Sequence, residues 1–291
     1  MRLDMGRERA RAEVVLYCRR MLAERLVDFT AGNISVRVDG EPGLYAVTPT
    51  GAPYDSLESA DVCLATIDGE VVAGHLKPTT EFPLHTLMYR RRPEVGAIVH
   101  THSAGAMTMA ALGWTLPPIL TGFVAAAGGA VRTAPYARPG TEALADVTAD
   151  ALADRGACFL RHHGLLAIGA TLHHAYNAAS VTEGAAEVFL RASTFGPVPE
   201  LPEEEVAWIA EVWREQWRGA GAAPPPDLRN SALTLRSTIR LSHSRPGTPD
   251  LPPRPGVPVC RGGRRPVRLR ANARILPTGI KLGVVKCYPM A

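Results

Sequence analysis

Residues 96–112 read Gly-Ala-Ile-Val-His-Thr-His-Ser-Ala-Gly-Ala-Met-Thr-Met-Ala-Ala-Leu, and the local structure of the chain is expected to change within them. The apolar run 96–99 predicts a buried strand, and Ala104–Leu112, which a glycine follows, predicts a helix. His100 and His102 lie at the junction. Because side chains alternate between the two faces of a strand, both imidazoles are expected on one face at its end.

Helix and strand patterns alternate on both sides of this junction. Apolar residues at spacings of three and four predict helices at 7–27, 84–91, 141–155, 172–192 and 203–217. Short apolar runs bounded by glycine, proline or aspartate predict strands at 44–48, 62–67, 158–160 and 165–168, and a turn followed by a strand within 29–37. This alternation is typical of a mixed α/β domain, and no internal repeat is visible.

The 291 residues are enough for one or two domains, but their charge is unevenly distributed. Residues 219–291 contain 13 Lys and Arg, two acids and 12 of the 25 prolines, whereas residues 1–218 contain 19 Lys and Arg and 26 acids. We predict a folded domain over 1–218 and a disordered, Pro-rich basic tail over 219–291, because the tail has too few apolar residues to offset the entropy of ordering. A basic arm for anionic partners and a shifted reading frame are the alternative interpretations of the tail.

Five cysteines are dispersed without the spacing of a metal or redox motif. In a chain of this size they indicate reduced thiols and a cytoplasmic protein, so no structural disulfide is expected. Neither a signal peptide nor a run of about 18 apolar residues is present, which argues against a membrane association. Because the basic excess lies in the tail, a nucleic acid is not expected as a partner of the folded domain.

Histidines give the strongest chemical signal. His100 and His102 supply two imidazoles, half of a tetrahedral zinc site, although two histidines packed at a strand end are the alternative. Residues 159–164, Phe-Leu-Arg-His-His-Gly, again run from an apolar strand into histidine, and the spacing leaves His162 and His163 equally open as a third ligand. Three imidazoles with an open fourth position are typical of catalytic zinc. Surface or packing roles are expected for the others, which are His75, His85, His173, His174 and His243.

Three polar turns are candidates for binding an anion. Residues 77–81 read Lys-Pro-Thr-Thr-Glu, so that Thr79, Thr80 and Glu81 come just before a predicted helix, where hydroxyls and backbone N–H groups suit a phosphate. A plain helix cap, with Glu81 in the first turn, is the alternative. The other two turns are not Walker loops or dinucleotide fingerprints, and they contain Gly32-Asn33 and Thr50-Gly51.

Seven motifs in sequence order resemble those of the class II aldolase/adducin family, and within it those of the L-fuculose-1-phosphate aldolases. They are TAGNISVR, VTPTGAPY, KPTTE, VHTHS, AAAGG, APYARPGT and HHGLLAIG, and the resemblance spans about residues 8–217. It implies a three-layer α/β/α fold around a mainly antiparallel sheet. It also implies a homotetramer with active sites between neighbouring subunits.

The resemblance further implies the roles of ten residues. The zinc ligands would be His100, His102 and His163, and Glu81 would sit on the metal at rest and act as the base once substrate displaces it. The phosphate cradle would consist of Gly32, Asn33, Thr50, Gly51, Thr79 and Thr80. The implied reaction is the reversible cleavage of a ketose 1-phosphate, L-fuculose 1-phosphate or a related deoxy-sugar phosphate, into dihydroxyacetone phosphate and an aldehyde. Zinc, or another divalent metal, would stabilise the enediolate.

One departure from the family pattern concerns the aldehyde. The L-fuculose-phosphate aldolases have a tyrosine a few residues before AAAGG, whereas residues 120–124 read Leu-Thr-Gly-Phe-Val, and a second, C-terminal tyrosine has no clear match. We therefore predict a different aldehyde, from a 5-deoxypentulose phosphate or a methylthio analogue, or weaker activity. One alternative function is a ribulose-phosphate 4-epimerase, although such enzymes typically have aspartate in place of Glu81. The other is a non-catalytic adducin-like module, against which the retained histidines argue.

Overall fold

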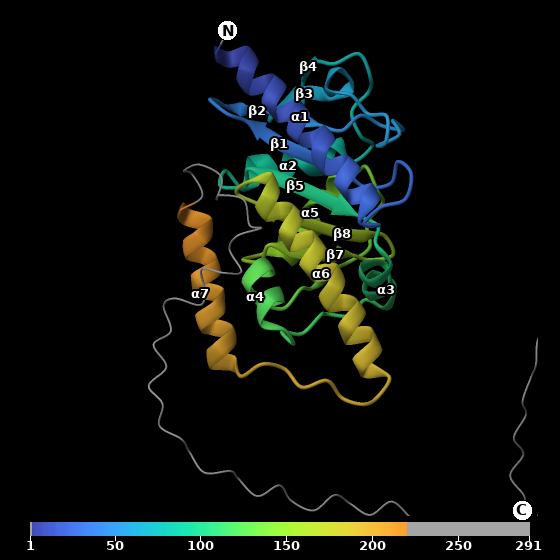
Figure 1. Cartoon of the computed structure of the whole chain (residues 1–291), viewed down its shortest axis with the longest axis vertical. Coiled ribbons are helices and arrows are strands. Elements are labelled where there is room, and N and C mark those ends of the chain that lie inside the picture. Colours follow the sequence, from blue (N-terminus) through green and yellow to red (C-terminus); the bar gives the residue numbers. More distant parts are fainter. Residues whose placement is uncertain (1, 220–291) are drawn as a thin grey trace, which may run out of the picture. The chain divides into compact units, whose positions relative to one another are not determined.

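A computed structural model describes residues 2–219 as seven helices on the two faces of one eight-stranded sheet (Figure 1). The three-layer α/β/α architecture expected from the sequence is confirmed. Apart from Gly219, which ends the last helix, the predicted tail 219–291 lies outside the described residues. Within the described part of the chain, no helix combines the length and hydropathy that crossing a membrane requires.

The sheet has the strand order β4-β3-β2-β1-β5-β8-β7-β6. All neighbouring strands are antiparallel except β6 and β7, so the expectation of a mainly antiparallel sheet is confirmed. The strands are β1 (Asn33–Val38), β2 (Glu41–Val47), β3 (Cys63–Thr66), β4 (Val71–Ala73), β5 (Ala97–Thr101), β6 (Thr133–Ala134), β7 (Ala157–Leu160) and β8 (Gly164–Gly169).

Helices bury both faces of the sheet. The central strand β5 shows this division, because Ala97 and Val99 belong to one hydrophobic core and Ile98 belongs to the other. The first core contains residues of α1 (Arg2–Ala23), α3 (Ala104–Leu112), α4 (Thr121–Ala127), α6 (Leu172–Ser193) and α7 (Glu203–Gly219). The second contains residues of α2 (Phe82–Arg91) and α5 (Glu142–Leu152). Burial of both faces explains why residues 96–99 read as a continuous apolar run.

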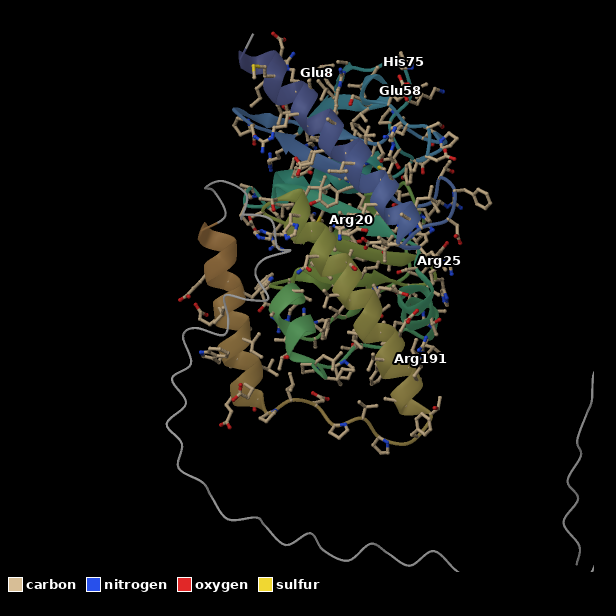
Figure 2. The ribbon with its side chains drawn as sticks, in the orientation of Figure 1. Glu8, Arg20, Arg25, Glu58, His75 and Arg191 are labelled. Atoms are coloured by element: carbon tan, nitrogen blue, oxygen red, sulfur yellow. The ribbon has the colours of Figure 1, made fainter. Side chains whose placement is uncertain are left out.

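Polar contacts link the helices of the first core. Arg20 of α1 pairs with Glu24 at 2.7 Å, and its guanidinium lies 4.6 Å from the ring centroid of Tyr176 on α6 (Figure 2). The hydroxyl of Tyr176 donates to Glu24 at 2.9 Å. These contacts hold α1 against α6 above the central strands.

The boundaries of the predicted elements differ from the observed ones by a few residues. The first helix ends at Ala23 instead of residue 27, because Arg25 adopts a left-handed backbone with φ of 58° and the N–H of Leu26 donates to Met21 O at 2.9 Å. The short elements α4, β4, β6 and the 3₁₀ turn η1 (Ser59–Asp61) were not predicted. They have two to seven residues each, too few for a periodic pattern.

Candidate active site

Three histidines meet at one end of the sheet. His100 lies in β5, His102 follows the end of this strand, and His163 occupies the turn between β7 and β8. The antiparallel register pairs Thr101 with Leu165, which brings the turn beside the end of β5. The ring centroids lie 4.7 to 5.0 Å apart, and one ligand atom from each ring falls within 4.8 Å of the others.

The structure separates His163 from His162. His163 is in the cluster, whereas His162 has a left-handed backbone with φ of 56°, is exposed, and has its ring centroid 6.3 Å from that of Tyr136. The unusual backbone at His162 turns the two neighbouring side chains in different directions. Of the two histidines that the sequence spacing left open, His163 is the one that lies in the cluster with His100 and His102.

Glu81 lies next to the histidines, with a side chain only 4% exposed. Its Oε2 is 3.1 Å from Nε2 of His100, and its Oε1 is 3.2 Å from Nε2 of His163. Glu81 occupies the N-cap position of α2, but its carboxylate makes no capping hydrogen bond. The side chain therefore serves the cluster and not the helix terminus.

The donor atoms of this cluster fit a divalent metal. His100 Nδ1 donates to Leu165 O at 2.8 Å, which leaves the lone pair of Nε2 facing Glu81 and, at 2.8 Å, His102 Nε2. Burial lowers the pKa of both His100 and His102 to about 3, so both rings are neutral. Glu81 Oε1 is buried without a hydrogen-bond partner among the described residues. Lone pairs and a carboxylate that converge in this way suit a cation, and neutral imidazoles with one carboxylate suit zinc.

The segment after His102 is fixed by a residue from another helix. Ser103 Oγ donates to Glu183 Oε2 at 2.6 Å, and the backbone N–H groups of Gly105 and Ala106 donate to the same carboxylate at 2.8 and 2.7 Å. Glu183 belongs to α6 and thus caps the N-terminus of α3, where a negative charge is favoured. No sequence motif marks this residue, because 78 positions separate it from Gly105.

We expect the Glu183→Ala variant to lower the free energy of unfolding by about 2–3 kcal/mol, because three donors at the start of α3 lose a charged acceptor. Urea denaturation followed by circular dichroism measures this change. The matched control is Glu187→Ala, one turn further along α6, whose pair with Arg191 lies at the surface at 3.4 Å and should contribute less than about 0.5 kcal/mol. Equal losses in the two variants would show that the cap of α3 adds nothing.

The predicted anion-binding turns come together beside the histidines. Thr50 N donates to Lys77 O and Thr79 N donates to Thr48 O, both at 2.9 Å, so residues 48–51 and 77–80 lie side by side. Thr50, Gly51 and Thr80 are exposed, and a hollow of about 320 Å³ opens beside Thr50 and Gly51. Thr79 is buried, and its hydroxyl accepts a hydrogen bond from Glu81 N at 3.3 Å.

Gly32 and Asn33 join the same group from the start of β1. Asn33 pairs with His100 across the sheet, and its Nδ2 donates to Glu81 Oε2 at 3.2 Å. Gly32 has φ of 74°, and a Cβ at this position would lie 2.5 Å from His100 O. Only glycine permits this close approach of the loop to the histidine strand.

His85 is the residue for which the sequence prediction was incomplete. A surface or packing role was expected, but His85 is fully buried and its Nε2 lies 2.6 Å from Asn33 Oδ1. It comes four positions after Glu81, a spacing that places two residues on the same face of a helix. That spacing is the one signal in the sequence that could have connected His85 to the site.

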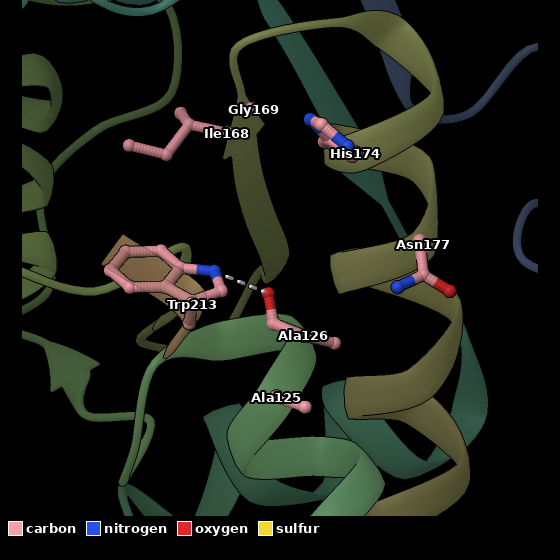
Figure 3. Close-up of a pocket in the computed structure, with 7 residues that line it drawn as sticks. All are labelled: Ala125, Ala126, Ile168, Gly169, His174, Asn177 and Trp213. Carbon is pink, nitrogen blue, oxygen red and sulfur yellow. Dashed lines mark hydrogen bonds between the residues drawn. The ribbon is translucent and has the colours of Figure 1, made fainter. Parts of the chain in front are cut away.

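A second, smaller cavity of about 50 Å³ lies away from this cluster (Figure 3). Trp213 of α7 closes one side and donates to Ala126 O at 3.1 Å, while His174 and Asn177 of α6 face it from the other side. The cavity borders Ile168 and Gly169, at the opposite end of β8 from His163 and about 17–20 Å along the strand. None of the candidate site residues lines it.

Comparisons with known proteins agree with this geometry. A family model described as the Class II Aldolase and Adducin N-terminal domain matches residues 12–190. A 5-deoxy-D-ribulose 1-phosphate aldolase of Bacillus thuringiensis serovar kurstaki is 38% identical over 204 residues, which cover 70% of this chain and 95% of that protein. An L-fuculose phosphate aldolase of Escherichia coli strain K12 is 34% identical over 211 residues, which cover 72% and 96%. The solved structure of an L-fuculose 1-phosphate aldolase matches with a TM-score of 0.67 and 33% identity, covering 70% of this chain and 96% of that one.

Proposed function

Because the chain belongs to the class II aldolase and adducin family, we propose that it is a zinc-dependent aldolase that cleaves a ketose 1-phosphate into dihydroxyacetone phosphate and an aldehyde. One observation carries this proposal: the buried carboxylate of Glu81 lies 3.1 and 3.2 Å from Nε2 of His100 and of His163, and one of its oxygens has no hydrogen-bond partner among the described residues. A binding module without catalysis has no need of such a costly arrangement.

We assign the metal to His100, His102 and His163, with Glu81 as a further ligand in the resting enzyme. When bound, a divalent metal supplies a fixed positive charge for substrate oxygens on which negative charge develops. Zinc is the ion that this donor set favours, although other divalent ions accept imidazole and carboxylate ligands. Class II aldolases are metal-dependent, and the clustering of the three histidines supports this assignment.

We assign the proton transfer to Glu81. In the direction of cleavage, the carbon–carbon bond of the ketose breaks as the hydroxyl on the departing carbon loses its proton and becomes the aldehyde oxygen. The electron pair of the bond stays on the three-carbon fragment, and Glu81 delivers a proton to that carbon, so that overall one proton has moved from the hydroxyl to the carbon. In the reverse direction Glu81 removes the same proton and the carbon then attacks the aldehyde. A carboxylate held in a dry site beside the reacting carbon is suited to both steps.

The substrate phosphate would bind to the turns 48–51 and 77–80 together with Gly32 and Asn33. Thr50 and Gly51 present exposed hydroxyl and backbone groups at a hollow, and Thr80 presents an exposed hydroxyl in the neighbouring turn. We also propose a homotetramer with active sites between neighbouring subunits, as the resemblance to the family implies. Analytical ultracentrifugation would test this oligomeric state. We also propose a cytoplasmic location, in keeping with the dispersed cysteines.

We expect the aldehyde product to differ from that of the L-fuculose-phosphate aldolases. Gly122 stands in α4 near the position of the tyrosine in the L-fuculose-phosphate aldolases, and nothing lies within 4 Å of where its Cβ would be. No hydroxyl is available from this residue to bond the aldehyde oxygen. The similarity to a 5-deoxy-D-ribulose 1-phosphate aldolase favours a 5-deoxypentulose 1-phosphate as the substrate.

We expect kcat/KM for 5-deoxy-D-ribulose 1-phosphate to exceed that for L-fuculose 1-phosphate by about tenfold or more, because L-fuculose 1-phosphate has one more hydroxyl, and leaving it without a partner costs about one hydrogen bond. A coupled assay for dihydroxyacetone phosphate on the zinc-loaded full chain measures both. The Gly122→Tyr variant, whose Cβ would meet no atom within 4 Å, should narrow the difference. A strong preference of the unmodified enzyme for L-fuculose 1-phosphate would contradict the substrate assignment. Conversion of a pentulose phosphate into its epimer, followed by NMR, would favour an epimerase instead.

A further inference from the structure

A chain of buried hydrogen bonds runs from the middle of α2 to Glu81. Tyr89 Oη lies 2.8 Å from Ser35 Oγ, which lies 2.6 Å from His85 Nδ1. His85 Nε2 lies 2.6 Å from Asn33 Oδ1, and Asn33 Nδ2 lies 3.2 Å from Glu81 Oε2. All five residues are buried, so water does not compete for these contacts.

The chemistry of the groups determines which atom donates and which accepts in each of these hydrogen bonds. His85 is fully buried, and its ring nitrogens Nε2 and Nδ1 each lie 2.6 Å from a polar partner, Asn33 Oδ1 and Ser35 Oγ. In an imidazole with one ring proton, one nitrogen donates and the other accepts. Carboxylate oxygens accept hydrogen bonds, and the Asn33 side chain presents Nδ2 to Glu81 and Oδ1 to His85. His85 therefore carries its proton on Nε2, and Nδ1 accepts from the hydroxyl of Ser35.

We propose that His85 is a positioning residue for Glu81, which acts by locking the side-chain amide of Asn33 with its donor group toward the carboxylate. The inference rests on the proposed function, because it gives the base of that reaction its orientation. Without the His85 proton, the Asn33 amide can rotate by half a turn and present an oxygen to the Glu81 carboxylate, which repels it. The carboxylate then loses its donor and moves away from the place where it transfers the proton.

These hydrogen bonds also explain why position 85 is a histidine. A leucine of similar size would leave two buried partners, Asn33 Oδ1 and Ser35 Oγ, without a bond to residue 85. A glutamine can donate from its amide nitrogen to Asn33 and accept from Ser35 with its oxygen. The two substitutions therefore separate loss of the bond from loss of the ring.

The test compares the zinc-loaded full-length variants His85→Leu and His85→Gln with the unmodified enzyme. We expect His85→Leu to lower kcat by about 10- to 100-fold, the effect of one hydrogen bond to a charged group, with KM changed less than about threefold and the zinc content unchanged. His85→Gln is expected to restore kcat to within about threefold of the unmodified value. The matched control is His174→Leu, a half-buried histidine of α6 at the distant cavity, which should leave kcat unchanged.

A second measurement does not depend on activity. ¹⁵N NMR of the imidazoles should show His85 protonated on Nε2 and unprotonated on Nδ1, and the side-chain amide of Asn33 should exchange slowly with solvent except in His85→Leu. A folded, zinc-loaded His85→Leu enzyme with unchanged kcat, or a proton found on Nδ1, would overturn the proposal. Absence of aldolase activity in the unmodified enzyme would contradict the proposed function instead, and the NMR result would still report on His85.

Discussion

Substitution of His163 by alanine is expected to weaken zinc binding by more than about 100-fold and to reduce aldolase turnover to the background of the assay. The expectation follows from the geometry, in which one ligand atom from each of the three imidazoles lies within 4.8 Å of the others and Glu81 Oε1 lies 3.2 Å from His163 Nε2. Loss of an outer hydrogen-bond partner alone costs 10- to 100-fold in metal affinity, and loss of a ligand should cost more. Metal analysis after dialysis against a chelator, together with the dihydroxyacetone phosphate assay, measures both effects.

The chain provides a matched control at the adjacent position. His162→Ala removes an identical side chain that is exposed and outside the cluster, so its zinc content and turnover should equal those of the unmodified enzyme. Zinc at about 1,000 times its dissociation constant should also stabilise the unmodified protein, but not His163→Ala, by about 4 kcal/mol. Loss of zinc in His162→Ala with retention in His163→Ala would reverse the ligand assignment.

We expect Glu81→Gln to lower kcat by about 10²- to 10⁴-fold, which is the usual contribution of a general acid or base. Glutamine has the shape of glutamate but cannot take up the proton of the reacting carbon. The three histidines remain, so the variant should still bind zinc, although less tightly. Steady-state kinetics with the preferred ketose 1-phosphate, and metal analysis of the same sample, separate the two effects.

Solvent exchange tests the same role without cleavage. In D₂O the unmodified enzyme should incorporate deuterium into dihydroxyacetone phosphate when no aldehyde is present, and Glu81→Gln should not. The control is Glu70→Gln, an exposed carboxylate in the turn between β3 and β4 that should change neither kinetics nor exchange. Unchanged exchange in a zinc-loaded Glu81→Gln enzyme would mean that another group moves the proton.

The sequence by itself determined much of the architecture. The apolar run 96–99 and the following helical pattern correctly predicted β5 and α3, because strand and helix periodicity depend only on near neighbours. The period of two along a strand also predicted that His100 and His102 would lie close to each other, and they do. Seven motifs in order were sufficient for the family, which the family model and the relatives confirm.

The tertiary structure alone decided which residues complete the site. His163 rather than His162 faces His100 because the backbone at His162 is left-handed. No local sequence pattern predicts this conformation. Glu183 and His85 reach the site across 78 and 52 positions of sequence, to Gly105 and Asn33. Such contacts depend on strand order and register, which bring distant segments together, and hydrophobic periodicity specifies only the face that each segment buries.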